Sequence, residues 1–453
     1  MNRLRPILRR CQAPGKVAQR GSVTRVSFPS GLFLLILLLC GTLAACGHPP
    51  LPADGPTPTV TVPPGMPVVI TLAGWFDAAT FPFLDGEIAD FEAANPDIRV
   101  GILEMPRDAT QRREQFVALL QQGDTGVDIL LLDDSWLAGL VAGGGLTPLD
   151  RYVRSQDLSL ADFLPAAVEA NRIHGQLMAL PWIADGGLLY FRADLLDRYG
   201  HTPPTTWAEL QRLALDLKAR EGLPSGYVWP GAAYEGLTCS TLEFVWASGG
   251  DLLDNSGQLL FDIPPTRSAL QQMSDLIASG ASPPEVTGYQ EGKTLAAFQK
   301  GEAALMRNRA YAWAILNAPD SPLAGRVGVA PLPASCLMGQ SLALSAHSLH
   351  PEQALRFMAF LVGHQAQVRL ALQTGQPPAL VTAYEDEALA GDPFFAHLPS
   401  ALAGARPRPQ TAAYPRLSEV IYTEVNRMLS GQQSASTTAA NIQRRGEEAI
   451  QKR

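Results

Sequence analysis

The sequence is short of several features that would point to particular classes of protein. Tandem repeats are absent, as are the His-Glu-x-x-His zinc motif, the Gly-x-Ser-x-Gly elbow and a glycine-rich phosphate loop. These absences argue against the best-known metalloproteases, serine hydrolases and nucleotide-binding enzymes, and we expect neither a cofactor nor a metal. Only 17% of the residues are charged and the net charge is −8, which argues against nucleic acid as a partner.

Acidic residues are missing from the N-terminus, where none precedes Asp54. Seven basic residues lie between Arg3 and Arg25, and the apolar run 31–40 that follows is too short for a comfortable membrane span. The run leads into Leu-Ala-Ala-Cys at 43–46, which resembles a bacterial lipobox. We therefore expect a signal peptide over 1–45, a lipid on Cys46 and an anchor to the outer face of the cell membrane. An ordinary signal peptide or a transmembrane anchor is the alternative.

Cysteines are few in the chain that such cleavage would leave. Besides Cys46 there are only Cys239 and Cys336. These two could form a disulfide in an oxidising compartment, or they could be separate buried thiols. Sequence spacing does not distinguish the two cases, because it says nothing of the distance between the α-carbons.

The rest of the chain has the pattern of a large α/β protein. Residues 46–67 are rich in proline, threonine and glycine, which is typical of a tether. Hydrophobic periodicity then predicts alternating elements: strands at 68–72, 98–103 and 127–132, and helices at 85–94, 111–122 and 136–142. This alternation predicts a mostly parallel, helix-covered sheet, with no transmembrane helix after the leader. Thr206 and Glu209 have the spacing of a capping box at the start of a later helix.

Carboxylates stand at two places where the apolar pattern breaks. Asp133 directly follows an expected strand, at the sheet edge where α/β proteins bind ligands. It could also cap the helix that follows, although its neighbours could do so equally well. Asp185 interrupts the apolar stretch Gly175–Leu196, so it is either a ligand contact or a turn residue before two glycines.

Several segments resemble the family 1 extracellular solute-binding proteins of ABC importers. The resemblance is carried by DILLLDDSWLAGLVAGGGLTPLD at 128–150, GQLMALPWIADGGLLYFRADLLDRYGHTPPTTWAEL at 175–210, AAFQKGEAALMRNRAYAW at 296–313, GRVGVAPLP at 325–333 and HPEQALRFMAFL at 350–361. Within the family, the segment VWPGAAYEGLTCSTLEFVWASGGDLLD at 228–254 is most similar to trehalose/maltose-binding proteins.

The resemblance implies a two-lobed periplasmic-binding-protein-like fold (type II) with a ligand cleft between the lobes. It places three crossovers near 188–191, 326–327 and 376–378. The implied N-terminal lobe comprises 68–189 and 328–376, and the C-terminal lobe comprises 190–327 and 377–453.

The resemblance also implies a set of ligand contacts. Asp133, Asp185, Tyr311, Gly339 and Arg406 match binding positions of the family, although an arginine at 406 could also be surface charge.

The chain departs from the family at Arg309 and Gln340, where the family commonly has tryptophan. A guanidinium and an amide there favour a more polar ligand. Trp75, Trp229 and Tyr234 could supply stacking faces instead, or they could belong to the core, as we expect of Trp182.

These observations predict a non-enzymatic, lipid-anchored protein that closes by a hinge around a carbohydrate or another polyhydroxylated solute. We expect it to act as a monomer that delivers its ligand to the transmembrane subunits of an ABC permease. One alternative is a glycoside hydrolase that uses two of Asp133, Asp185 and Glu235. Another is a sensor or orphan lipoprotein for a different polar solute, for which Arg309 and Arg406 make an anionic ligand conceivable.

Overall fold

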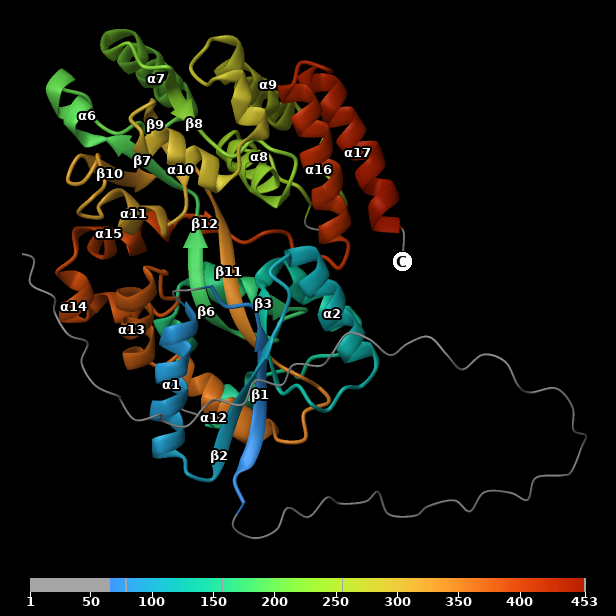
Figure 1. Cartoon of the computed structure of the whole chain (residues 1–453). Coiled ribbons are helices and arrows are strands. Elements are labelled where there is room, and N and C mark those ends of the chain that lie inside the picture. The colour runs from blue at the N-terminus through green and yellow to red at the C-terminus, as the bar shows by residue number, and fades with distance from the viewer. Residues whose placement is uncertain (1–65, 78–79, 156–157, 255, 452–453) are drawn as a thin grey trace, which may run out of the picture. The chain divides into compact units, whose positions relative to one another are not determined.

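The computed structural model describes residues 66–77, 80–155, 158–254 and 256–451. The expected signal peptide, Cys46 and nearly all of the tether lie outside these residues. Figure 1 shows two α/β lobes, each built on its own sheet. We call the part around the six-stranded sheet the first lobe, and the part around the four-stranded sheet the second lobe.

The sheet of the first lobe is mixed. Strand β1 (Val68–Gly74) is parallel to β2 (Ile98–Glu104) and β3 (Ile129–Asp133). Strand β11 (Ser335–Leu344) is antiparallel to both β3 and β6 (Ala179–Gly186). The short β12 (Ala405–Arg406) completes the order β12-β11-β3-β1-β2. The expected parallel pairing is therefore confirmed for the opening strands and also occurs between β11 and β12 and between β8 and β9. The pairs β11–β3 and β11–β6 are antiparallel, so the first sheet is mixed.

Alternate residues of β3 point to the two faces of this sheet. Ile129 and Leu131 belong to one apolar cluster with α1 (Thr80–Ala94), α12 (Pro351–Leu361) and α13 (His364–Thr374). Leu130 and Leu132 belong to another cluster with α2 (Ala109–Gln121) and α3 (Leu137–Ala142). Because side chains alternate along a strand, β3 is buried on both faces of the sheet. Only its last residue, Asp133, is partly exposed.

The sheet of the second lobe has the order β10-β7-β9-β8. Its strands are β7 (Leu188–Arg192), β8 (Ser225–Val228), β9 (Ala303–Asn308) and β10 (Val327–Pro331). One apolar cluster joins this sheet to helices α6 (Ala193–Tyr199), α7 (Trp207–Glu221), α8 (Glu235–Ala247), α9 (Pro264–Ala278), α16 (Tyr414–Leu429) and α17 (Ala435–Gln451). The capping box of Thr206 and Glu209 is confirmed at the start of α7.

Shorter elements fill the connections. They are α4 (Asp150–Ser155), α5 (Pro165–Ala170), α10 (Glu291–Gln299), α11 (Ala312–Leu316), α14 (Glu387–Ala390), α15 (Pro393–Leu402), strands β4 (Arg172–Ile173) and β5 (Gln176–Leu177), and the 3-10 turns η1 (Asp134–Trp136), η2 (Leu160–Asp162), η3 (Pro284–Gly288) and η4 (Val381–Glu385).

Sheet membership moves the lobe boundaries by a few residues. The chain changes sheet at Gly187, between β6 and β7, and again at 332–334, between β10 and β11. Residues 188–189 and 328–331, which the resemblance placed in the N-terminal lobe, pair within the second sheet.

The third predicted boundary lies at 376/377, and backbone hydrogen bonds tie the residues after it to the first lobe. Ala184 N donates to Pro377 O at 3.1 Å, and Leu164 N donates to Ala379 O at 2.9 Å. The chain is thus still bonded to first-lobe residues beyond position 377, and β12 returns to the first sheet at 405–406.

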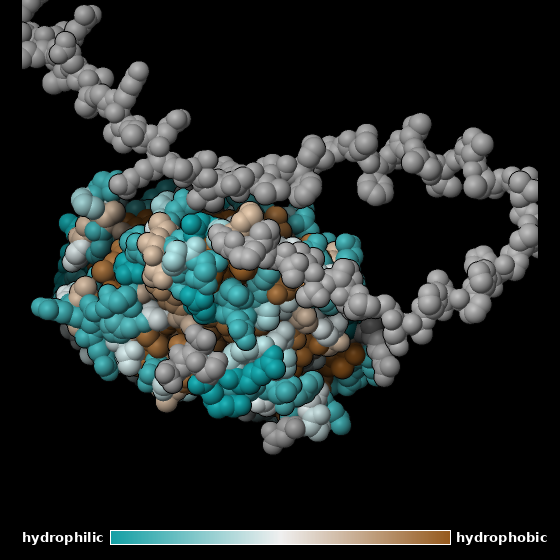
Figure 2. Space-filling view, turned by 90° about the horizontal axis from the view of Figure 1, so that it is seen from below, coloured by the Kyte–Doolittle hydropathy of each residue, from teal (hydrophilic) through white to brown (hydrophobic). Residues whose placement is uncertain are grey.

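On the face shown in Figure 2, hydrophobic side chains are interspersed among hydrophilic ones. Leu349 and Leu372 are among the exposed large apolar residues, and single exposed residues of this kind are common on globular proteins. None of the helices in the described ranges is both long and apolar enough to cross a bilayer.

Candidate ligand-binding site

A cavity of about 550 Å³ lies where α2 and η1 of the first lobe face α8 and α16 of the second. Its volume is within the range of small-molecule sites. The walls combine charged, hydroxyl and aromatic side chains: Asp108, Thr110, Arg113, Asp133, Ser135, Trp136, Tyr234, Glu235, Gln290, Tyr414, Arg416, Ser418, Glu419 and Tyr422.

Asp133 reaches this cavity from the end of β3, as the sequence predicted. Its Oδ1 atom accepts hydrogen bonds from Ser135 N (3.0 Å), Ser135 Oγ (2.5 Å) and Arg408 Nη2 (2.7 Å). Burial alone would raise the pKa of Asp133, but Arg408 and Ser135 together hold it below its ordinary value. The side chain is therefore an ionised, one-third exposed acceptor that also caps the following turn.

Arg408 is the most connected charge at the site. Its guanidinium is 1% exposed and donates to Asp133, to Asp134 and, through Nη1 at 3.0 Å, to Glu235 Oε1. Asp133 and Asp134 lie in the first lobe, whereas Glu235 begins α8 of the second. One buried cation therefore joins the carboxylates of the two lobes.

The sequence analysis gave Arg406 either as a match to a family binding position or as surface charge, whereas the arginine bonded to Asp133 is Arg408, two residues further on. Arg406 pairs with Asp251 at 2.5 Å, lies over the Trp246 ring at 4.7 Å and is 46% exposed. Both arginines stand in the segment ARPRP, where residues two apart share a face in extended chain. Contacts with Asp133, Asp134 and Glu235 place Arg408 at the cleft, whereas Arg406 is held by Asp251.

Gly339 and Gln340 lie beside this group but do not line the cavity. Gly339 N donates to Asp134 Oδ2 at 2.9 Å, and Gln340 pairs with Asp133 in the β11–β3 register. A β-carbon at position 339 would lie 3.0 Å from that carboxylate oxygen, so the glycine permits the close approach. Burial raises the pKa of Asp134 to about 6, although Arg408 acts to lower it, while Asp133 raises it further.

Asp185, for which the sequence left a ligand contact or a turn residue open, has its hydrogen-bond partners within the protein. It is 1% exposed, and its Oδ1 accepts from Gly186 N (2.7 Å) and Ala310 N (3.2 Å). Its Oδ2 accepts from Arg309 Nε at 2.9 Å. The carboxylate is thus occupied within the protein, and it orients Arg309, whose side chain is one-third exposed.

Tyr311, next to this pair, is half-buried and does not line the cavity. Burial, with Glu291 nearby, raises its pKa to about 12.

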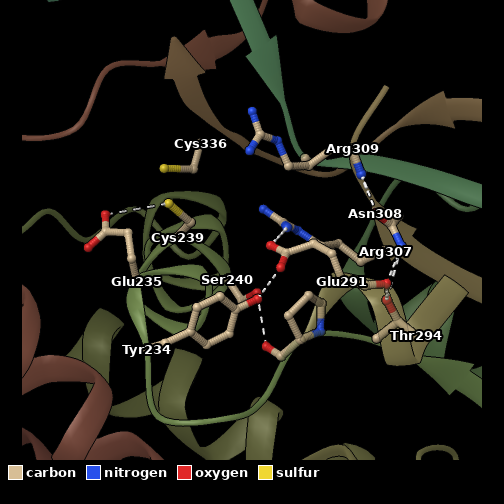
Figure 3. A network of polar contacts seen from close by, with 12 residues as sticks. Tyr234, Glu235, Cys239, Ser240, Glu291, Thr294, Arg307, Asn308, Arg309 and Cys336 are labelled. Carbon is tan, nitrogen blue, oxygen red and sulfur yellow. Dashed lines mark hydrogen bonds and ion pairs between the residues drawn. The ribbon is translucent and has the colours of Figure 1, made fainter. Parts of the chain in front are cut away.

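The predicted aromatic residues divide between site and core. Tyr234 lines the cavity, and its hydroxyl donates to Glu291, as Figure 3 shows. Trp229 is buried and donates through Nε1 to Ser282 Oγ at 3.0 Å, and Trp182 is also core, as expected. Trp75 is half-buried and lies 5.8 Å from the Arg112 guanidinium, outside the cavity.

Sequence reasoning missed three aromatic residues of the cavity wall. Trp136 follows the Asp133–Ser135 turn, and Tyr414 and Tyr422 lie on α16. Tyr414 also donates to Glu235 Oε1 at 2.7 Å. The position of Trp136 directly after the strand-end carboxylates was a usable signal. The two tyrosines belong to a helix whose place beside the cleft is not evident from its own residues.

Cys239 and Cys336 are free, buried thiols in the structure, so the disulfide is not formed there. Figure 3 shows Cys239 on α8, one turn after Glu235, with Cys336 near it. Burial and the neighbouring Cys239 raise the pKa of Cys336 well above its ordinary value. Within the described ranges, no group of three or more His, Cys, Asp or Glu side chains is arranged to hold a metal ion.

Two α/β lobes, joined by short crossovers around a polar and aromatic cavity, define the periplasmic-binding-protein-like fold. The chain belongs to the bacterial extracellular solute-binding proteins, whose sequence profile matches residues 78–368. This is a family of exported binding proteins rather than enzymes, and its members serve ABC transporters.

Individual relatives agree with this assignment. A probable ABC transporter-binding protein of Deinococcus radiodurans is 36% identical over 346 residues, which are 73% of this chain and 81% of the relative. Maltose-bound MalE3 of T. maritima is 37% identical with a TM-score of 0.74, covering 83% of this chain and 98% of that one. The sugar-binding protein MalE of Xanthomonas citri has a TM-score of 0.76 over 84% of this chain and 97% of its own, at 24% identity.

Proposed function

We propose that this protein binds a neutral di- or oligosaccharide, or a related polyol, in the cavity between its lobes and delivers it to an ABC permease. The observation that carries the proposal is the composition of the cavity wall. Asp133 and Glu235 offer acceptors for hydroxyl groups, and Trp136, Tyr234 and Tyr422 offer flat apolar faces. A sugar ring needs both, because its hydroxyls lie at the edge and its C–H groups lie on the faces.

Two relatives support a polyhydroxylated ligand. The T. maritima structure contains maltose, and a Pseudomonas aeruginosa relative, 25% identical over 67% of this chain and 72% of its own length, is a mannitol-binding protein. Arg309 is proposed as a further contact, since Asp185 holds its Nε and about one-third of the side chain remains exposed. Tyr311 and Gln340 are proposed as contacts that become available when the lobes move.

Charge argues for a neutral rather than an anionic ligand. The cavity wall contains four carboxylates and two arginines: Asp108, Asp133, Glu235, Glu419, Arg113 and Arg416. The buried Arg408 is already shared among three carboxylates. A sugar phosphate would therefore meet an excess of negative charge, which costs binding energy in a partly desolvated site.

The proposal extends to the anchoring, oligomeric state and closure of the protein. We propose that Cys46 carries the lipid and that the protein acts as a monomer on the outer face of the membrane. Ligand binding would close the lobes about the crossovers at Gly187 and 332–334, and the permease would recognise the closed form.

A ligand screen tests the proposed function. We expect maltose, trehalose or mannitol to raise the melting temperature of the purified protein, and glycerol 3-phosphate to leave it unchanged. Asp133→Asn should weaken binding of the ligand that responds by about tenfold or more, because the neutral amide is a poorer acceptor than the carboxylate. Isothermal titration calorimetry measures the affinities.

Two results would contradict the proposal. Hydrolysis of maltose during the titration would show an enzyme, and a response to the phosphate alone would show an anion site. Arg406→Ala serves as the control for the Asp133 variant and should bind normally, since its side chain is paired outside the cavity.

A further inference from the structure

A buried ion pair lies directly against both crossovers. Glu243 of α8 and Arg307 of β9 are each 1% exposed. Arg307 donates through Nη2 to Glu243 Oε1 at 2.7 Å and through Nε to Oε2 at 3.2 Å. Removing either charge would leave the other buried and unpaired, so the two groups act as a unit.

The backbone of the crossovers is fitted to this ion pair. A β-carbon at Gly187 would overlap Glu243 Oε1 and would lie 3.0 Å from Arg307 Nη2. Cys336 N donates to Glu243 Oε1 at 3.3 Å, and Ser335 Oγ donates to Gly187 O at 2.9 Å. The first and second crossovers therefore meet on the same carboxylate.

The other end of Arg307 points toward the ligand cavity. Its Nη1 atom lies 3.8 Å from Glu291 Oε1 and makes no hydrogen bond to any described residue. Glu291 in turn accepts a hydrogen bond from the hydroxyl of Tyr234, which lines the cavity. Figure 3 shows this line of contacts, from Tyr234 through Glu291 to Arg307.

We propose that Arg307 is a positioning residue that couples the ligand cavity to the hinge, acting on Tyr234 through Glu291 and on both crossovers through Glu243. The proposal rests on the proposed function, because it assumes that a ligand occupies the cavity.

The coupling has a definite physical basis. A buried guanidinium nitrogen without a hydrogen bond is costly, so Glu291 is drawn toward Nη1 whenever Tyr234 releases it. A ligand hydroxyl that accepts the Tyr234 proton provides that release. Ligand binding then selects between two arrangements of Glu291. In the first, Oε2 is bonded to Tyr234 and Oε1 lies 3.8 Å from Arg307 Nη1; in the second, Tyr234 is released and the carboxylate closes the gap to Nη1. In the second arrangement Glu243 and Glu291 both bind Arg307. The fixed guanidinium in turn fixes the Glu243 carboxylate, which contacts both crossovers.

Two conservative variants test the coupling in the purified full-length protein, with maltose as the probe. Glu291→Gln keeps the shape of the side chain and removes its charge, and we expect the Kd for maltose to rise about tenfold. Its melting temperature should change by no more than about 2 °C, because Glu243 still pairs with Arg307. Arg307→Lys retains the charge but loses the forked geometry, and it should weaken maltose binding at least as much.

The double variant separates coupling from direct contact. If Glu291 acts through Arg307, Glu291→Gln/Arg307→Lys binds maltose no more weakly than Arg307→Lys alone. If Glu291 touches the ligand independently, the two effects multiply, and the proposal is overturned. Maltose affinities within twofold of wild type for both single variants would overturn it as well.

Arg369→Lys is the matched control for loss of a forked pair. Arg369 holds the buried Glu87 by two bonds of 2.6 and 2.7 Å between α13 and α1, away from the crossovers. It should lower the melting temperature and leave maltose affinity within twofold. Failure of the wild-type protein to bind maltose or any other sugar in the screen would instead count against the proposed function, which keeps the two proposals apart.

Discussion

Replacing Arg408 with methionine is expected to destabilise the protein by about 3–5 kcal/mol and to weaken sugar binding by more than tenfold. The guanidinium is buried and serves Asp133, Asp134 and Glu235 together. Methionine fills similar space but leaves these carboxylates without their shared cation. Urea unfolding measures the stability, and calorimetric titration measures the affinity.

Arg406→Met is the matched control for this prediction. Arg406 and its partner Asp251 are both more than one-third exposed, and exposed pairs of this kind contribute about 0–1 kcal/mol. The control should therefore unfold nearly as wild type and bind the same sugar equally well. Equal losses in the two variants would show that Arg408 has no special role at the site.

The contrast between these arginines shows where sequence reasoning stopped. The strand-end position of Asp133 followed from local periodicity, and so did the capping box of Thr206 and Glu209. Which arginine of ARPRP enters the cleft depends on contacts with β3 and α8, which lie more than 150 residues away in sequence. No local pattern contains that information.

Asp185 illustrates a second limit. A carboxylate within an apolar run needs a partner, and the sequence analysis offered either a ligand or the backbone of a turn as that partner. The structure supplies Arg309 and two backbone amides instead. Arg309 and Ala310, which follow β9, satisfy the charge of Asp185. Apolar flanks alone therefore could not separate a ligand contact from a positioning residue.

The long-range geometry also bears on the hydrolase alternative. A glycosidase needs a protonated carboxylic acid on one side of the bond and a carboxylate on the other. Asp133 is ionised beside Arg408, and Asp185 is occupied behind Arg309. Asp133 and Glu235 also share one guanidinium. This arrangement suits two acceptors for ligand hydroxyls, as in a binding protein.

The stability of the protein should depend on pH through Asp134. Burial raises the pKa of Asp134 in the folded protein to about 6, against 3.8 for the free side chain, with Arg408 acting in the opposite direction. Between about pH 4 and pH 6 the folded state keeps a proton that the unfolded chain releases. The contribution of this group to the free energy of unfolding therefore falls as pH rises, by on the order of 3 kcal/mol over that window.

Asp134→Asn removes this titration, so the variant should gain stability relative to wild type between pH 4 and pH 6, while Asp251→Asn should follow wild type. Urea unfolding at several pH values measures the difference. A constant difference across the window would mean that Asp134 titrates as an ordinary carboxyl group. Since Asp133 and Asp134 share Arg408, they titrate as a pair, and the low pKa of Asp133 opposes the trend only at lower pH. At neutral pH Asp133 and Asp134 are then both ionised. The positive charge of Arg408 is needed most at that pH, because it offsets the repulsion between the two carboxylates.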